Sequence, residues 1–260
     1  MTPQEVRATI RSGRHKGPTA GLAPGALQAN LVILPKDQAQ DFTEFCMANP
    51  RPCPLLARSE FGDPRLPDLG DEIDLRYDLP GYLVWKAGQV VEERGDISEL
   101  WHGGLVAFVL GCSFGFEDAL QKAGIPLRHI ATGRNVAMYD SSIELMPVGE
   151  FSGNMVVSMR PIRAEQIDEV IRICSEFPLC HGAPIHVGAP EKIGISDLKR
   201  ADYGEPSKIL ENEVPVFWAC GVTPQNVIRN SQANFAITHA PGKMLICDVS
   251  ADWQPRLGLF

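Results

Sequence analysis

Two continuous apolar runs, each ending in a turn that holds a glycine and a cysteine ahead of a helix, constrain this chain most strongly. Residues 105–110 lead into Gly111-Cys112-Ser113, and residues 214–219 lead into Cys220-Gly221-Val222. An unbroken apolar run predicts a strand that is buried on both faces. Because strands and helices alternate along the rest of the chain, we expect an α/β or α+β fold with a mixed sheet and flanking helices.

The composition limits the class of protein. The 260 residues can form one large domain or two small ones, and a net charge of −8 argues against a broad nucleic-acid surface. The longest apolar stretch, about residues 103–116, is too short to cross a bilayer, and charged residues interrupt the N-terminus where a secretion signal needs an apolar core. Seven scattered cysteines without a CxxC pair favour reduced thiols over disulfides or zinc. We therefore expect a cytoplasmic protein.

Local patterns predict most of the elements. Thr2, Pro3 and Glu5 form a capping box at the start of a first helix. Prolines, glycines and aspartates predict long loops over residues 49–80. The periodicity predicts further strands at 29–34, 82–86, 89–92, 127–131, 136–139, 155–162 and 244–249, and further helices at 36–48, 164–177 and 223–230.

The two cysteine-containing turns are candidate sites. Free backbone N–H groups and the positive end of the helix dipole meet where a helix begins, and they favour a bound anion or a thiolate. Cys112 and Cys220 are therefore candidates for chemistry, with Gly111, Ser113 and Gly221 placed to contact a ligand. The alternative is that each cysteine is a small residue of the core.

Three histidines lie in glycine- and proline-containing segments. His181 and His186 flank Gly182-Ala183-Pro184-Ile185, and His239 precedes Ala240-Pro241-Gly242. Imidazole gains and loses protons near neutral pH, so these side chains are acid/base candidates. The alternative is that they belong to ordinary turns. The spacing of His181 and His186 fits neither a helical zinc motif nor a Cys/His knuckle, so we expect no metal site.

Two arginines and a tyrosine complete the candidate set. Arg160 interrupts an apolar strand, and Arg134 follows Gly133 between two predicted strands. Such an arginine either pairs with a buried acid or clamps a carboxylate. Tyr139 ends a neighbouring strand and is expected to join a polar site.

The chain resembles the D-glutamate cyclase family over most of its length. The stretches that carry the resemblance are Leu110-Gly111-Cys112-Ser113-Phe114, Gly133-Arg134-Asn135-Val136-Ala137-Met138-Tyr139, Val156-Val157-Ser158-Met159-Arg160-Pro161, His181-Gly182-Ala183-Pro184-Ile185-His186, Pro215-Val216-Phe217-Trp218-Ala219-Cys220-Gly221-Val222-Thr223-Pro224 and Thr238-His239-Ala240-Pro241-Gly242. One departure follows Tyr139, where the family has Arg-Thr-Asn and this chain has Asp140-Ser141-Ser142.

The resemblance implies an α/β fold in two subdomains, a three-layer α/β/α part and a smaller two-layer part. We divide the chain into an N-terminal α/β subdomain at residues 1–150 and a C-terminal one at residues 151–260, and a discontinuous subdomain is the alternative to this division. It also implies a hydro-lyase that removes water from a small amino or carboxylic acid, such as D-glutamate closing to 5-oxo-D-proline. His181, His186 and His239 would then move protons, Arg134 and Arg160 would hold carboxylates, and the N–H groups of the two turns would bind the oxyanion.

Two other functions remain open from the sequence. A cofactor-independent racemase or epimerase would use Cys112 and Cys220 as opposed acid/base thiols, and a non-catalytic module would only bind a small carboxylate. For all three, the expected partner is a small carboxylate rather than nucleic acid or membrane, and no cofactor is expected. A homodimer is the commonest oligomer for such a chain.

Overall fold

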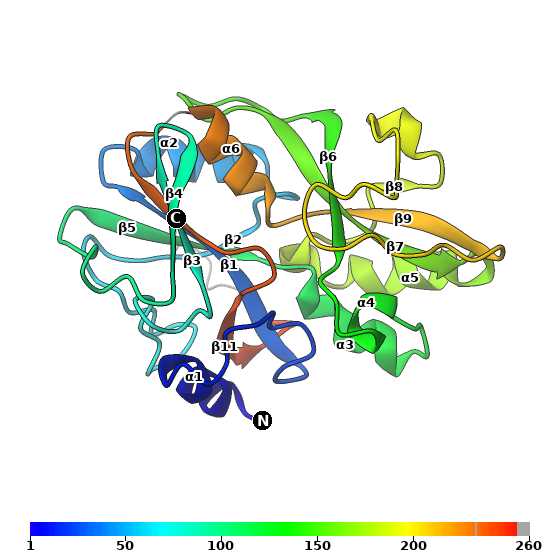
Figure 1. Ribbon diagram of the computed structural model, residues 1–260, viewed down its shortest axis with the longest axis horizontal. Coiled ribbons are helices and arrows are strands. Elements are labelled where there is room, and N and C mark those ends of the chain that lie inside the picture. The colour runs from blue at the N-terminus through cyan, green and yellow to red at the C-terminus, as the bar shows by residue number, and fades with distance from the viewer. Residues whose placement is uncertain (232, 254–260) are drawn as a thin grey trace.

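Two antiparallel sheets lie side by side in the computed structural model, which describes residues 1–231 and 233–253 (Figure 1). The larger sheet has the order β2-β5-β1-β10-β3-β4, with β11 also paired to β1, and the smaller has the order β6-β7-β9-β8. The strands are β1 (Ala26–Pro35), β2 (Leu55–Arg58), β3 (Tyr82–Lys86), β4 (Gln89–Arg94), β5 (Leu105–Gly111), β6 (Ala137–Glu144), β7 (Asn154–Arg163), β8 (His186–Val187), β9 (Glu213–Ala219), β10 (Ala236–His239) and β11 (Leu245–Ser250).

The expected combination of helices and strands is confirmed, but the strands do not form a mixed sheet. Every strand pairing within the described ranges is antiparallel. The physical reason lies partly in the hairpins: β3 pairs directly with β4, and β6 with β7, so the chain reverses at each step. In an antiparallel sheet, adjacent strands have their C-terminal ends at opposite edges. One such sheet alone therefore cannot bring the C-terminal ends of neighbouring strands together.

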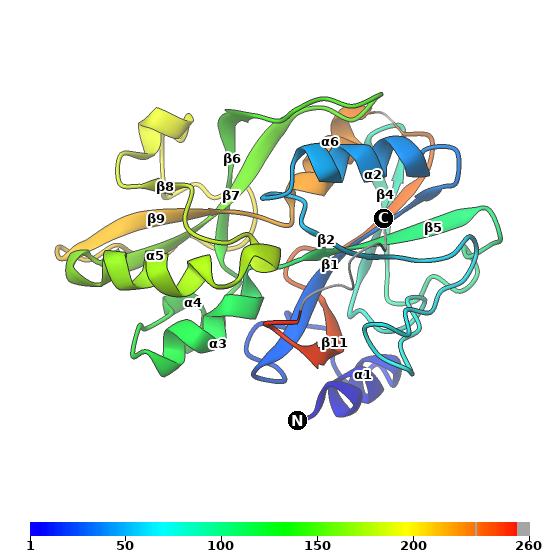
Figure 2. The same cartoon turned by 180° about the vertical axis from the view of Figure 1, so that it is seen from behind.

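The two predicted buried strands, β5 and β9, are interior strands of the larger and the smaller sheet. All seven residues of β5 are buried, and β5 pairs with β1 from Ala29 opposite Gly111 to Pro35 opposite Leu105. β9 pairs with β7 from Ala219 opposite Val157 to Glu213 opposite Arg163. β5 and β9 run toward the middle of the molecule from opposite sides (Figures 1 and 2). Their C-terminal ends therefore meet where the sheets adjoin.

Six α-helices and three short 3-10 helices are found within the described residues. The α-helices are α1 (Pro3–Arg11), α2 (Ala39–Ala48), α3 (Phe114–Lys122), α4 (Arg128–Ala131), α5 (Ile167–Ser175) and α6 (Thr223–Ser231), and the 3-10 helices are η1 (Ala164–Gln166), η2 (Pro178–Cys180) and η3 (Pro190–Ile193). The capping box of α1 is confirmed, since the Thr2 and Glu5 side chains bond each other's backbone N–H.

Three predictions of local structure were wrong. Residues 128–131 form the helix α4 instead of a strand, because Leu127 ends an extended segment and the chain then closes helical hydrogen bonds. β2 lies within the stretch expected to be loop, since three of its four residues pair with β5 despite the prolines before them. Thr238 and His239 end the strand β10, and the turn begins only after them.

The helices α3, α4 and α5 lie together on one face of the smaller sheet (Figure 2). Phe116 of α3 and Trp218 of β9 are fully buried there, with ring centroids 5.6 Å apart. In α5, Val170, Ile173 and Cys174 are buried, whereas Ile171 is 37% exposed. The opposite face packs on a second core that contains α2 and α6 residues.

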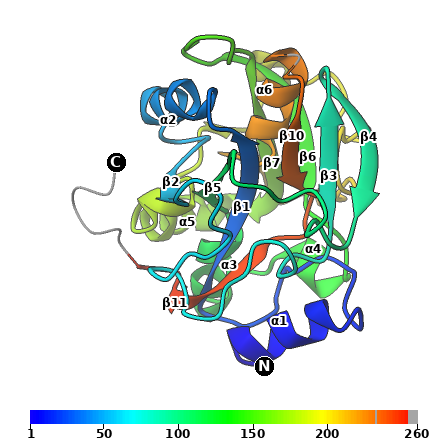
Figure 3. The same ribbon diagram turned by 90° about the vertical axis from the view of Figure 1, so that its left-hand side faces the viewer.

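β4 is one of the edge strands of the larger sheet. It lies at the right of Figure 3, and α1 lies at the bottom of that view. This sheet takes β10 and β11 from the C-terminal part of the chain, and the smaller sheet takes β6 from before residue 150. Sheet membership alone does not define a domain, so the subdomain boundary at residues 150 and 151 stays a prediction.

The last residue of β5 generates a stability prediction. A Cβ atom on Gly111 would lie 1.5 Å from the Leu179 carbonyl oxygen, so the backbone would have to shift. We expect Gly111→Ala to lower the free energy of unfolding by about 1–3 kcal/mol, as overpacking does, in urea titrations. Gly95→Ala is the control, since nothing lies within 4 Å of its added Cβ. Equal stability of the two variants would contradict the contact.

Candidate functional site

The two cysteine-containing turns come together where the sheets adjoin. Cys112 and Cys220 are both buried and belong to one apolar cluster with Phe114, Met138 and Val222. This shared cluster places the two thiols in the same buried region. The sequence predicted these turns separately, and the structure brings them into one candidate site.

Asn30 of β1 connects the turns, and the sequence reading missed it. Its Nδ2 donates to the carbonyl oxygens of Gly111 and, at 3.4 Å, Leu110. On its other side lies Gly221, where an added Cβ would be 1.8 Å from the same nitrogen. Glycine is therefore required at position 221 because the Asn30 amide occupies the space. The available signal was an amide inside an otherwise buried strand, which costs free energy unless it is bonded.

Backbone N–H groups near the helix starts act on both thiols: that of Phe114 lowers the pKa of Cys112, and those of Gly221 and Val222 lower the pKa of Cys220. Burial outweighs these effects: it raises the pKa of Cys112 well above its usual value and that of Cys220 to about 11. Both groups are therefore neutral thiols at pH 7, because desolvation disfavours the thiolate.

Arg160 of β7 is the centre of a buried polar network that includes Ser113 of the first turn. Its Nε and Nη2 donate to Glu117 Oε1 at 3.1 and 2.5 Å. Its Nη1 donates to Ser158 Oγ at 3.1 Å, and Nη2 also donates to Ser113 Oγ at 3.0 Å. His129 Nε2 lies 2.9 Å from the same Glu117 oxygen. Ser113, the last residue of the first turn, is thereby tied to the smaller sheet.

The network supports the first of the two interpretations of Arg160, the partner of a buried acid, over the carboxylate clamp. The guanidinium carbon lies 5.3 Å from the Phe116 ring centroid and 5.2 Å from that of Trp218, so aromatic rings flank the charge. Four of its five N–H donors are used within the protein. The structure therefore makes Arg160 the partner of a buried acid, and its use as a carboxylate clamp stays a prediction with one donor left for it.

Glu117, in the first turn of α3, is the acid of this pair. Burial disfavours its carboxylate, but Arg160 and His129 outweigh burial and hold its pKa below the usual value. No local pattern signals the pair, because its two members are 43 residues apart.

His181 follows the η2 helix, and Arg160 of this network acts on its pKa. Its Nδ1–H donates to the Arg51 carbonyl oxygen at 2.7 Å, and its Nε2 is buried without a hydrogen-bond partner. Burial lowers its pKa to about 4, with Arg160 and Arg51 contributing in the same direction. The φ of 74° is a left-handed value that a histidine rarely adopts. The result is a neutral imidazole that keeps a lone pair free on Nε2.

His239 is also buried and neutral, at the end of β10. The Leu31 N–H donates to its Nδ1 at 3.2 Å, and Gln225 Nε2 donates to its carbonyl oxygen at 2.8 Å. Burial lowers its pKa to about 4. His239 contacts β1 one residue beyond Asn30 and so lies beside the second turn.

Three predicted site residues, His186, Arg134 and Tyr139, are not brought into the cluster. His186 packs against Phe217 at 5.8 Å between ring centroids, on the sheet face opposite to Trp218 and Arg160, because neighbouring residues of β9 point to opposite faces. Arg134 is exposed, and its Nε lies 3.2 Å from Glu205 Oε2. A role for either residue stays a prediction.

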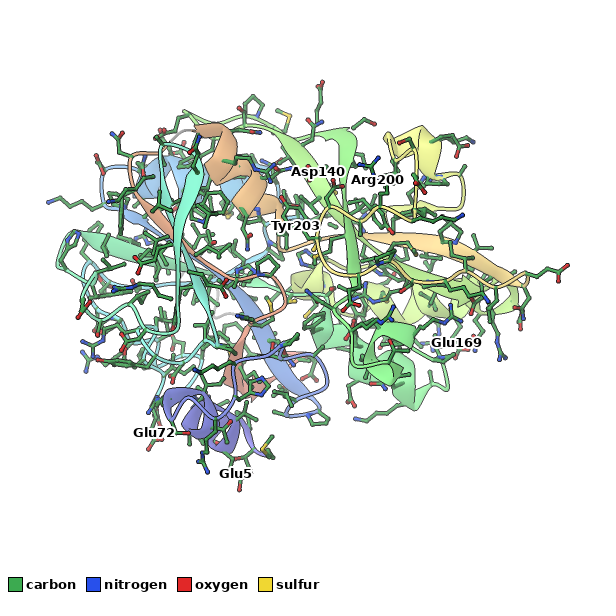
Figure 4. All side chains as sticks on the ribbon, viewed as in Figure 1. Glu5, Glu72, Asp140, Glu169, Arg200 and Tyr203 are labelled. Carbon is green, nitrogen blue, oxygen red and sulfur yellow. The ribbon has the colours of Figure 1, made fainter. Side chains whose placement is uncertain are left out.

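Tyr139 lies on the same opposite face. Its hydroxyl donates to the Leu198 carbonyl oxygen at 2.7 Å, and burial raises its pKa to about 12. It lines a separate pocket of about 360 Å³ with Asp140, Asp202 and Arg200. Asp140, Arg200 and Tyr203 lie around β6 and the segment after β8 (Figure 4).

Asp140, which stands where the family has arginine, has cationic and amide neighbours. Asn226 Nδ2 donates to its Oδ1 at 3.1 Å. Burial and then Asp202 raise the pKa of the Asp140 carboxyl group, while Arg229 opposes them. Arg229 also donates to the Tyr203 hydroxyl, so a cation reaches this surface from α6.

No group of three or more His, Cys, Asp or Glu side chains within the described ranges is arranged to hold a metal ion. In the same part of the chain, no helix has the length and apolar character needed to cross a membrane.

The buried pair generates a mutational prediction. Glu117→Gln would leave Arg160 without its counter-charge, so we expect a loss of about 3–5 kcal/mol in the free energy of unfolding, measured by urea titration. The control is Asp118→Asn on the next residue, whose carboxylate pairs with the exposed Lys122. Similar, small losses in both variants would contradict a central role for the pair.

The buried histidines predict acid lability. His181 and His239 stay neutral in the fold down to a pKa of about 4, whereas the unfolded chain takes up protons below about 6.5. The unfolded state therefore binds more protons between these values, and stability falls as the pH falls, by up to about 3 kcal/mol for each histidine. Urea titrations from pH 7 to 4 should show this fall, and His181→Asn should remove about half of it. Constant stability over this interval would show that the histidines are not held neutral.

Comparison with known proteins places the chain. The family model for D-glutamate cyclase matches residues 106–248. A Bordetella petrii protein named "Putative hydro-lyase" is 54% identical over 95% of this chain and 94% of its own length. Proteins with the same description from Xanthobacter autotrophicus and a Methylobacterium species are 51% and 52% identical, over 95% of this chain and 90% and 92% of theirs.

Among solved structures, a nitrogen repressor-like protein from Methanococcus jannaschii aligns over 96% of this chain and 99% of its own, with a TM-score of 0.39 and 8% identity. That score is too low to indicate a shared fold. The sequence matches, by contrast, extend over nearly the whole chain and include both turns, β7 and the His181 segment. The chain belongs to the D-glutamate cyclase family, and the similar proteins described above are named "Putative hydro-lyase".

Proposed function

We propose that this chain removes water from a small amino acid and that it closes D-glutamate to 5-oxo-D-proline. Family membership supports the class of reaction. The observation that carries the proposal is the meeting of the two turns at Asn30, because it joins two helix N-termini, a buried ion pair and a neutral histidine. Helix N-termini favour the carboxylates that such a substrate carries.

In this reaction the α-amine nitrogen attacks the carbon of the γ-carboxyl group. A C–N bond forms, a C–O bond breaks, and two protons of the ammonium group leave with the released oxygen as water. The site must accept a proton from the ammonium group, donate to the leaving oxygen and hold amine and carboxyl in contact. The chemistry requires no cofactor.

Ser113 is proposed to bond the leaving oxygen. Its Oγ accepts from Arg160, so its own hydroxyl hydrogen is free to point at a ligand. The N–H groups of Gly221 and Val222 act on the Cys220 thiol by lowering its pKa, and sulfur is a weak acceptor that a substrate oxygen would outcompete for them. These donors together form the proposed oxyanion pocket.

His181 is proposed to accept the proton. Its Nδ1 hydrogen is committed to the Arg51 carbonyl oxygen, so Nε2 carries the lone pair, and that atom has no partner. With a pKa of about 4 it is unprotonated throughout the neutral range. His239 supports the second turn through Gln225.

The closeness of Cys112 and Cys220 favours a second candidate, a racemase that uses opposed thiols. Such a reaction needs one thiolate, and burial raises the pKa of both groups, for Cys220 to about 11. We therefore place this function second. A small-carboxylate substrate, the cytoplasmic location and a homodimer stay predictions.

Turnover tests the proposal directly. The protein incubated with D-glutamate should form 5-oxoproline, detected by mass spectrometry, and Ser113→Ala and His181→Asn should each reduce the rate about 100-fold or more. Ser175→Ala, on the exposed side of α5, is the matched control and should keep the full rate. Because His181 titrates near 4, the rate should not change with this group between pH 5.5 and 8.

Absence of product would remove the cyclase function. Interconversion of D- and L-glutamate that disappears in Cys220→Ser would instead establish the racemase. Binding of glutamate without any turnover would indicate the non-catalytic module.

A further inference from the structure

The backbone around His181 has an unfavourable conformation. His181 and Gly182 have φ values of 74° and 67°, and such left-handed values strain residues other than glycine. The N–H groups of Cys180 and Gly182 donate to the Phe177 carbonyl oxygen at 2.9 and 3.0 Å, which closes the turn from one side. A strained residue persists only where its surroundings determine its conformation, so further contacts must hold His181.

Arg51 supplies contacts from the other side of this turn. Its Nη2 donates to the His181 carbonyl oxygen at 3.4 Å and to the Ala183 carbonyl oxygen. The two acceptors flank Gly182, and the two hydrogens of Nη2 allow one nitrogen to reach both. Because a guanidinium is charged at neutral pH, its hydrogen bonds are stronger than those of a neutral donor. The Arg51 side chain therefore fastens the backbone on both sides of Gly182.

The main chain of Arg51 orients the imidazole of the same histidine. His181 Nδ1 lies 2.7 Å from the Arg51 carbonyl oxygen and donates to it. A carbonyl oxygen can only accept, so this bond keeps the hydrogen on Nδ1 and the lone pair on Nε2. Arg51 thus holds His181 twice, at the ring through its carbonyl group and at the backbone through its guanidinium group.

The segment that carries Arg51 also contacts the first cysteine-containing turn. The Gly111 N–H donates to the Pro54 carbonyl oxygen at 2.9 Å, and the Cys53 N–H donates to the Asn49 carbonyl oxygen at 3.0 Å. Asn49 is buried, and its Nδ2 donates to two further carbonyl oxygens at 2.9 and 2.8 Å. This anchored segment therefore joins the imidazole to the turn at the end of β5.

We propose that Arg51 is a positioning residue for His181, because its side chain keeps residues 181–183 in the conformation that presents Nε2 to the substrate. The assignment rests on the proposed function, in which Nε2 accepts the proton. Arg51 acts through the histidine and not by contact with the substrate. A misplacement of about 1 Å can reduce a rate roughly 100-fold, so loss of the guanidinium should affect turnover although the imidazole remains.

Turnover of D-glutamate by Arg51→Ala tests this role. The kcat should fall by about 10- to 100-fold and KM should change by less than about twofold, because a contact that only places the base affects chemistry and not binding. Arg51→Lys keeps a charged donor and should recover the rate to within about fivefold of the unaltered protein. Arg58→Ala, at the exposed end of β2, is the matched control and should keep the full rate. A raised KM with unchanged kcat, full activity of Arg51→Ala, or an equal loss in Arg51→Lys would overturn the assignment.

Hydrogen exchange of backbone amides tests the role independently of turnover. The Gly182 amide should exchange about tenfold or more faster in Arg51→Ala, because the turn opens locally more often. The Gly111 amide, at the end of β5, should keep its exchange rate and is the internal control. Selective acceleration at Gly182 without formation of 5-oxoproline would leave Arg51 as the support of His181 and remove only the cyclase function. Unchanged exchange at Gly182, or equal acceleration at both amides, would contradict the positioning role.

Discussion

The buried ion pair between Arg160 and Glu117 is the interaction on which the rest of the site depends. It joins β7 of the smaller sheet to α3, the helix that begins at the end of β5 in the larger sheet. An isolated buried charge would be very costly, so each member fixes the other. Ser113, His129 and the rings of Phe116 and Trp218 are arranged around the pair.

This constraint explains why antiparallel sheets can form a site at strand ends. Within one such sheet, neighbouring strands end at opposite edges. Here the ends of β5 and β9 come from different sheets, and Asn30 of β1 fills the space between their turns. The requirement for glycine at 221 and at 111 follows from the same close packing, against the Asn30 amide and the Leu179 carbonyl. Backbone from three segments thereby approaches a single region.

Burial sets the chemistry of the site more strongly than helix dipoles do. The N–H groups at both turns would lower the pKa of a cysteine in a hydrated setting, yet the thiols here are protonated. The same burial keeps His181 and His239 neutral. A site of this kind is better suited to accept protons through imidazole than to attack through sulfur, which is why elimination of water ranks above thiol chemistry.

The sequence predicted what depends on short-range patterns. The strands around residues 105–110 and 214–219, the α1 cap and the two turns are read from neighbouring residues, and the family follows from motifs that contain them. It could not predict partners far apart in the chain. Glu117 and Arg160 are 43 residues apart, and Asn30 is an amide within a largely apolar strand. His186 and Arg134 occur in motifs next to site residues, but strand alternation and an exposed loop place them elsewhere.

A crystal structure with bound 5-oxo-D-proline would test the central claim most directly, because it locates the ligand without reference to rates. Binding at the two turns predicts ligand oxygens within about 3 Å of Ser113 Oγ and of the Gly221 or Val222 N–H groups. Ligand bound instead in the pocket between Tyr139 and Asp202, or in the hollow lined by Arg11 and Lys243, would contradict it.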